Sequence, residues 1–267
     1  MVTTDGYFAA DGAARRVSRE LALLLGGGRA LLLQVAHPLV AAGVAEHSGY
    51  RENPWKRLEG TMNAVWAIVF GTRAQADRAA RRVRAMHGKV HGNLPEAMGR
   101  YPAGTPYSAL DPELLLWVHA TLVDTALLVH GRWVRPLSDA EQSAYYDEMK
   151  RCARLFGTPG DVIPETFAGF RAYMEGMLDG PDLCVTATAR DIARSVMHPP
   201  LPVPMRPAMQ WSNLVTAGLM PEHLRRAYGL TWDPARAALV AGSREWTRHI
   251  AMRLLPVRLR TVPASRV

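Results

Sequence analysis

The sequence predicts an all-α protein that folds as a single multi-helix globular domain. No segment sustains the alternation of apolar and polar residues that marks a half-buried strand, whereas helix start signals recur from end to end. Glycines such as Gly71 and Gly157 stand where predicted helices should stop. The chain has 267 residues, 48% of them hydrophobic, which is enough to bury one large core. We therefore expect one domain over residues 1–267, with residues 1–11 as an N-terminal extension and residues 256–267 as an irregular basic tail.

Helix starts are marked by capping residues that precede proline or belong to a reciprocal capping box. Asparagine or aspartate precedes proline at Asn53–Pro54, Asp111–Pro112 and Asp233–Pro234, and the missing N–H of proline costs nothing at the first helical position. Ser138–Glu141 has the capping-box pattern, and Thr72–Gln75 has a weaker version of it. These signals predict about ten helices. Their approximate ranges are 12–25, 29–47, 54–70, 73–91, 111–131, 138–156, 164–179, 183–197, 206–219 and 233–255.

Two stretches are expected to be irregular, the loop 93–110 and the proline-rich segment 199–207. Pro38 lies inside the second predicted helix, so it must kink that helix or restart it at His37. No strand precedes the triple glycine Gly26–Gly28, which is therefore expected to be a helix stop and not a dinucleotide-binding loop.

Composition points to a soluble cytoplasmic protein. The two cysteines lie far apart, which argues against a disulfide framework or a thiolate metal site and favours a reducing compartment. The N-terminus does not resemble a signal peptide, and no stretch reaches the roughly 20 apolar residues of a membrane span. The net charge is +8, but arginines and acids are interleaved as far as Glu245, which indicates a solvated surface and no nucleic-acid partner. The tail is the exception. Its arginines have no acidic residue between them, so the tail could contact an acidic surface. These arginines are Arg253, Arg258, Arg260 and Arg266.

Several polar residues lie on helix faces whose other residues are apolar and are expected to be buried in the core. Arg57 and Thr61 are four residues apart and share one face of the helix at 54–70, which Val65 and Ile68 continue inward. His87 falls on the apolar stripe of the helix at 73–91.

Two further histidines have the same character. His119 joins an apolar stripe in the helix at 111–131, and His37 lies within an apolar run. A buried polar group without a partner costs about 1–3 kcal/mol. Histidines at such positions indicate either a buried hydrogen-bond network or a bound cofactor.

Zinc and haem are the two cofactors that this pattern could suit. His87 and His91 have the i,i+4 spacing of a zinc pair, but no acidic or cysteine ligand stands near them. Haem needs one axial imidazole, a large apolar slot and cations for its propionates, and the composition supplies all three. No nucleophile elbow, P-loop or singled-out carboxylate pair supports a hydrolase.

Some of the same residues carry a resemblance to a known family. The chain resembles the bacterial DUF2236 family, which is grouped with the MpaB-type oxygenases and the rubber oxygenase called latex clearing protein. The resemblance covers about residues 12–255. The segments that carry it are Arg29–Pro38, Gly43–Ser48, Pro54–Leu58 with Thr61, Val69–Gly71 and Trp117–Thr121.

The resemblance implies an all-helical fold with globin-like features around a cofactor pocket that holds haem b. In the rubber oxygenases a segment similar to Arg84–Val90 supplies the haem ligand, so His87 would be the metal ligand here. Arg57 and Thr61 match residues that accompany the haem, and His119 matches another histidine important there.

Each matched residue then has an expected role. Arg57 would pair with a haem propionate or stabilise an anion at the iron, and Thr61 would donate a hydrogen bond nearby. His119 or His37 would act as a base or support the ligand. Arg84 and His91 are counted among the cofactor-binding residues.

The chain also departs from the rubber oxygenases. Gly60 stands where those enzymes place a lysine over the iron, and the region 39–43 has no clear equivalent of their proposed glutamate base. These departures argue against polyisoprene cleavage. The expected function is a haem b-dependent oxygenase that acts with dioxygen on a small intracellular substrate, as a monomer or a homo-oligomer.

Two rival hypotheses belong to other classes. The first is a cofactor-free helical protein in which the histidines and Arg57 form a buried polar network that serves structure or partner binding. The second is a basic nucleic-acid-binding protein, whose affinity would fall steeply with salt.

Overall fold

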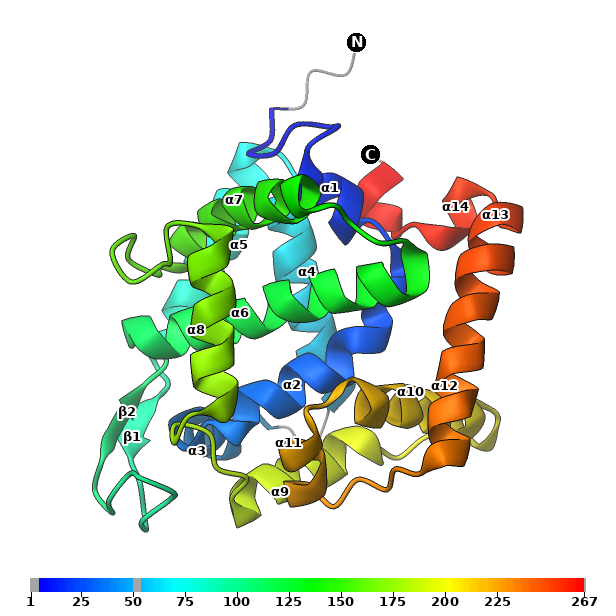
Figure 1. Ribbon diagram of the computed structural model, residues 1–267. Coiled ribbons are helices and arrows are strands. Elements are labelled where there is room, and N and C mark those ends of the chain that lie inside the picture. The colour runs from blue at the N-terminus through cyan, green and yellow to red at the C-terminus, as the bar shows by residue number, and fades with distance from the viewer. Residues whose placement is uncertain (1–4, 50–53, 267) are drawn as a thin grey trace.

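Helix α6 (Pro112–Val129) runs through the middle of the protein, and other helices pack around it (Figure 1). The Asp111 carboxylate caps its start by accepting hydrogen bonds from the N–H groups of Glu113 and Leu114. Trp117 and Val123 on this helix are completely buried. The computed structural model describes residues 5–49 and 54–266, and the side chains of residues 54–58 and 266 lie outside that description.

The apolar character of α6 corrects one expectation from the sequence. The stretch Pro112–Val134 has a mean hydropathy of 1.5, and by length and composition it could cross a membrane. However, 72% of its most apolar window is buried inside the protein. Since neighbouring helices already cover these side chains, α6 has the burial of a core helix.

The N-terminal part of the chain forms four short helical segments where the sequence predicts two long helices. They are α1 (Ala13–Ser18), the 3-10 helix η1 (Leu21–Gly26), α2 (Gly27–Ala36) and α3 (Pro38–His47). The second predicted helix is broken by a bend of 106°. Pro38 begins α3 and His37 is its N-cap in extended conformation, which confirms the restart predicted at His37.

The triple glycine allows helices to approach each other closely. Gly26 ends η1, as a helix stop should, but Gly27 begins α2 at once. A Cβ atom added at Gly28 would collide with Thr216 on α10 (Arg206–Leu219), and one at Gly26 would collide with Thr125 on α6. Glycine is therefore required here for packing as well as for chain direction.

We expect Gly28→Ala to lower the free energy of unfolding by about 1–3 kcal/mol, because the added methyl group forces α2 away from Thr216. Urea denaturation followed by circular dichroism measures the loss. Gly242→Ala is the matched control, since no described atom lies within 4 Å of its Cβ position. That helical site should gain stability from alanine. Equal losses in both variants would contradict the packing explanation.

Helices α4 (Pro54–Phe70) and α5 (Arg73–His87) pack against each other and against α7 (Asp139–Phe156). Thr72 caps α5 through a full capping box with Gln75, and Ser138 caps α7 in the same way with Glu141. Both boxes confirm predicted helix starts. Helix α5 ends at His87, four residues before the predicted end at 91.

The segment after α5 corrects a second expectation. Strands β1 (His91–Asn93) and β2 (Pro106–Ser108) form a two-stranded antiparallel sheet that pairs His91 with Ser108. This hairpin begins at the end of the helix predicted over 73–91 and continues into the region 93–110 expected to be irregular. Tyr107 is buried there against Ala42, Leu94 and Met98, which explains why so short a sheet is held in place.

The C-terminal half adds helices and one turn that the sequence analysis missed. The helices are α8 (Phe167–Asp179), α9 (Ala187–Met197), the 3-10 helix η3 (Val203–Met205), α10, α11 (Glu222–Ala227), α12 (Pro234–Trp246), α13 (Met252–Leu254) and α14 (Val257–Arg260). The missed turn is α11. Two π-helical turns, η2 (His130–Val134) and η4 (Thr247–Ala251), extend α6 and α12, and η5 (Pro263–Arg266) is a 3-10 turn.

The sequence predicts an irregular tail, and the structure corrects this: the described part of the tail forms α14 and η5 and pairs with the N-terminal region. Thr261 forms an antiparallel bridge with Glu20, and the Val262 N–H donates a 2.8 Å hydrogen bond to the Arg19 carbonyl. In Figure 1 the C-terminal turn η5 is drawn beside α1, whereas α14 lies next to α13.

One main hydrophobic cluster contains residues from every helix from α1 through α9 and from α11, and smaller clusters surround it. With ten helices of seven or more residues in the described part, the predicted helical domain is confirmed.

Candidate functional site

Three histidines each keep one buried ring nitrogen without a hydrogen-bond partner among the described residues. The atoms are Nδ1 of His37, Nδ1 of His87 and Nε2 of His119. Buried polar groups in folded proteins are nearly always paired, and leaving one unpaired costs about 1–3 kcal/mol. These nitrogens are therefore the first places to look for a bound group.

His87 is the last residue of α5, where the helix gives way to Gly88. Its side chain is half-buried, and burial lowers the pKa of the imidazole below its ordinary value. The ring is then neutral at pH 7, with one nitrogen carrying a lone pair. A neutral imidazole with an unpartnered nitrogen is the form that binds a transition metal.

His119 lies on the face of α6 that meets α7. Its side chain is buried, and the backbone of Met149 on α7 hydrogen-bonds to the ring. Burial lowers the pKa of His119 to about 4, although the Met149 hydrogen bond opposes this change. The ring is thus held in a fixed orientation, with Nε2 buried and unpartnered.

His37 belongs to a chain of three polar side chains that sequence reasoning missed. The Tyr101 hydroxyl donates a 2.8 Å hydrogen bond to Oδ1 of Asp182 and lies 3.1 Å from Nε2 of His37. Because the hydroxyl hydrogen points to the carboxylate, Nε2 of His37 carries the proton and donates to Tyr101. The buried Nδ1 of His37 then holds a lone pair. Tyr101 and Asp182 stand far from His37 in sequence, so no local pattern could find them.

Electrostatics keeps the His37 ring uncharged. Burial lowers the pKa of His37 to about 4, an effect that the negative charges of Asp182 and Asp111 partly oppose. Burial and the hydrogen bond to Asp182 raise the pKa of Tyr101 above its ordinary value. Both groups are therefore neutral at pH 7.

We expect Tyr101→Phe to lower the free energy of unfolding by about 1–3 kcal/mol, because the buried Nε2 of His37 loses its acceptor. Thermal unfolding followed by circular dichroism measures the change. Tyr7→Phe is the matched control, since it removes a 2.7 Å hydrogen bond to Asp77, which is only half-buried, whereas His37 is buried. A smaller loss of unfolding free energy in Tyr101→Phe than in Tyr7→Phe would contradict the hydrogen-bonded connection of His37 through Tyr101 to Asp182.

The remaining predicted residues on and after α5 lie in different surroundings. Arg84 donates a short hydrogen bond to the Leu155 carbonyl and lies against Gly157, so it ties α5 to the end of α7. His91 is exposed on β1. The structure therefore separates these two side chains from any shared buried site with His119.

The predicted residues on α4 are only partly described. The Arg57 side chain lies outside the described residues. Thr61 is exposed, Val65 is half-buried and Ile68 is completely buried, so the face turns inward later along the helix than the sequence predicts. At Gly60, no described atom lies within 4 Å of an added Cβ.

Convergence of these residues on one pocket is not found in the described part of the chain. No hydrogen bond or ring contact joins any two of His37, His87 and His119 there. No group of three or more His, Cys, Asp or Glu that could hold a metal ion occurs among the residues searched, 5–49 and 54–266.

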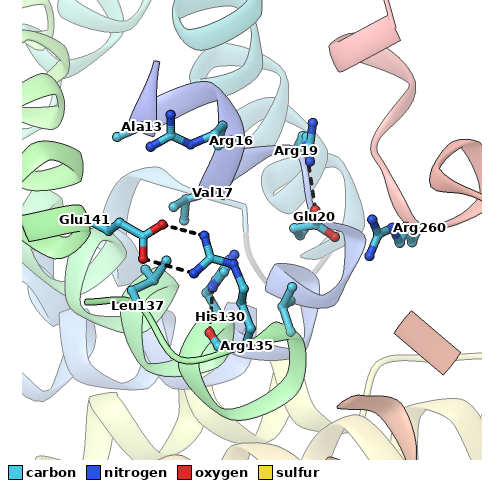
Figure 2. A pocket seen from close by; sticks show the side chains of 11 residues that line it. Ala13, Arg16, Val17, Arg19, Glu20, His130, Arg135, Leu137, Glu141 and Arg260 are labelled. Atoms are coloured by element: carbon cyan, nitrogen blue, oxygen red, sulfur yellow. Dashed lines mark hydrogen bonds and ion pairs between the residues drawn. The ribbon is translucent and has the colours of Figure 1, made fainter. Parts of the chain in front are cut away.

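Neither of two cavities in the described part of the chain is lined by a predicted site residue. The first, of about 200 Å³, lies between α1, η2, the start of α7 and α14, and Figure 2 shows Glu20 and Arg260 on its wall with Arg135 paired to Glu141. The second, of about 460 Å³, is lined by Lys150, Arg154 and residues 160–165. The candidate site therefore rests on the unpartnered histidine nitrogens.

Comparison with known proteins identifies relatives. A family model described as ER-bound oxygenase mpaB/B′/rubber oxygenase, catalytic domain, matches residues 14–250. Uncharacterized protein Mb2261 of Mycobacterium bovis and uncharacterized protein Rv2237 of Mycobacterium tuberculosis are each 30% identical over 239 residues. The alignment covers 85% of this chain and 88% of each relative. No solved structure matches the chain significantly.

Proposed function

Because this chain belongs to the family of ER-bound oxygenase mpaB/B′ and rubber oxygenase catalytic domains, we propose that it is a haem b-dependent oxygenase. Family membership supports an enzyme of the oxygenase type, which uses dioxygen and a substrate. The haem, the axial ligand and the kind of substrate are the proposed parts.

The observation that carries the proposal is the buried, unpartnered Nδ1 of His87. The ring is kept neutral by burial, and it stands at the end of a helix whose start is fixed by a capping box. His87 therefore offers the uncharged, unpartnered nitrogen that an axial haem ligand needs. Haem, when bound, supplies the redox chemistry of oxidation by dioxygen.

Other residues of this chain would support the cofactor and the substrate. Arg57 is proposed to pair with a haem propionate, as a guanidinium does with carboxylates. Thr61 is proposed to donate a hydrogen bond near it. His119 and His37, each with an uncharged nitrogen, are the candidates for holding or moving a proton.

The proposed substrate is a small molecule of the cytoplasm and not polyisoprene. The argument is Gly60, which stands where the rubber oxygenases place a lysine and leaves space with no described atom within 4 Å. Because this chain has glycine in place of that lysine, we expect it to accept other substrates near the cofactor than the rubber oxygenases do.

Haem content of the purified protein tests the proposal. The chain is produced in cells supplied with iron and 5-aminolevulinate, and its visible spectrum and pyridine haemochrome are recorded. We expect a Soret band and about one haem per chain. A colourless protein that also fails to bind added ferric haem would overturn the proposal and favour a cofactor-free buried network.

A further inference from the structure

The surface formed by α12, η4, α13 and α14 exposes an unusual number of large apolar side chains. In Figure 1 these elements lie along one edge of the protein, with α12 packed on α10. We define the C-terminal apolar surface as the exposed large apolar residues of these elements and their connections. They are Leu239, Trp246, Ile250, Leu254, Leu255, Val257 and Leu259.

These side chains are well exposed, and four of them share one side of the continuous helical stretch from α12 to α13. Leu254 is 76% exposed, Leu259 64% and Trp246 58%. Leu239, Trp246, Ile250 and Leu254 recur at intervals of seven, four and four residues, which keeps them on one face. Val240 and Ala251, which follow Leu239 and Ile250 in the sequence, lie on a neighbouring face and are buried. A continuous exposed apolar stripe of this kind marks an interaction surface.

The formally charged side chains in the segment after Glu245 are all positive. After Glu245 the chain carries five arginines and no aspartate or glutamate. Arg253 and Arg258 are exposed between the apolar residues, while Glu245, at the edge of the surface, lies 3.1 Å from His249. Positive charge thus accompanies the apolar residues after Trp246, whereas one acid, Glu245, lies beside Trp246.

We propose that the C-terminal apolar surface docks the protein on the surface of an anionic lipid bilayer. A helix that lies in the interface places leucine and tryptophan at the acyl boundary and arginine among the phosphates, which is the arrangement seen here. Tryptophan at the edge of such a surface fits the headgroup region.

Charge decides between a bilayer and a second copy of this chain. A two-fold contact through this surface would bring the arginines of one copy against those of the other, and among its described residues the surface offers only Glu245, already 3.1 Å from His249, to pair with them. An anionic bilayer supplies both the apolar layer and the opposite charge. The inference rests on this surface alone and is independent of the haem proposal.

Vesicle flotation of the full chain tests the inference. We expect binding to vesicles of phosphatidylcholine with 30% phosphatidylglycerol, weak binding to phosphatidylcholine alone, and loss of binding in 0.5 M NaCl. The variants Leu254→Ser/Leu259→Ser and Arg253→Glu/Arg258→Glu should each lower the partition coefficient about tenfold or more. All four positions are exposed, so both variants should fold as wild type does.

Matched controls alter other exposed residues by the same chemistry. Arg81→Glu/Arg82→Glu on α5 changes net charge equally, and Leu24→Ser/Leu110→Ser removes exposed apolar groups elsewhere. Both should bind vesicles as wild type does.

Brominated lipid should quench wild-type fluorescence, and Trp246→Phe should lose most of that quenching.

Three results would overturn the inference. The first is no flotation with anionic vesicles. The second is an equal loss of binding in the α5 control, which would indicate net charge and not this surface. The third is a dimer, seen by light scattering, that Leu254→Ser/Leu259→Ser dissociates, because it would assign the surface to a second copy.

Discussion

Replacing Asp124 by asparagine should lower the free energy of unfolding by about 3–5 kcal/mol, because it leaves the buried guanidinium of Arg29 without its counter-charge. The Arg29 Nη2 atom lies 2.8 Å from Oδ2 of Asp124, and both side chains are at least 90% buried. Arg29 also donates to Thr125 Oγ1 at 2.6 Å and to the Leu219 carbonyl at 3.0 Å. One cation thus joins α2, α6 and α10, and its charge has no route to solvent.

Urea denaturation of Asp124→Asn measures this loss. The control is Arg171→Met, since Arg171 is half exposed and lies 3.4 Å from the same carboxylate, where a pair contributes about 1 kcal/mol or less. The double variant Arg29→Met/Asp124→Leu should recover part of the loss, because it leaves no unpaired charge. A double variant less stable than Asp124→Asn would contradict the explanation.

Lowering the pH from 6.5 to 4 should destabilise the protein by about 3 kcal/mol through His119 alone. The pKa of His119 is lowered by burial to about 4 in the folded state, whereas the unfolded chain has the ordinary value of 6.5. Between these values the unfolded state binds more protons, so stability falls as pH falls. Above pH 6.5 the contribution no longer changes.

The difference between wild type and His119→Phe isolates this effect, because His37, His87 and His130 also have pKa values lowered by burial. Unfolding free energies are measured at intervals from pH 7 to pH 4.5. The variant should show a shallower fall than wild type. His223→Phe, at an exposed position on α11, is the control and should keep the wild-type slope. Identical slopes for all three proteins would contradict the buried neutral state of His119.

Local signals in the sequence were sufficient to predict most helices. The helix at 54–70 and the helix at 206–219 have the predicted bounds. Caps and prolines act within a few residues, so the helix starts at Pro112 and Pro234 could be read directly. The breaks could not be read in this way. The chain breaks after Ser18 because Glu20 pairs with Thr261, a contact between the two ends of the chain.

The burial of two candidate site residues could be predicted from the sequence, but their arrangement in space could not. Helical periodicity correctly placed His119 in the core, and His37 is buried at the predicted restart of the helix. Thr61 is exposed because the periodicity of α4 gives a face without saying where along the helix burial begins. The partners of His37 come from the hairpin region and from the segment before α9, and only the fold brings Tyr101 and Asp182 together.

The central proposal is that His87 holds the haem iron, and the absorbance spectrum of ligand variants tests it most directly. Wild type, His87→Ala and His91→Ala are loaded with ferric haem, and the Soret band and haem content are compared. We expect His91→Ala to match wild type, because His91 is exposed on β1. His87→Ala should lose the wild-type band and at least tenfold in haem affinity, and added imidazole should restore the band. An unaltered spectrum and affinity in His87→Ala would contradict the assignment.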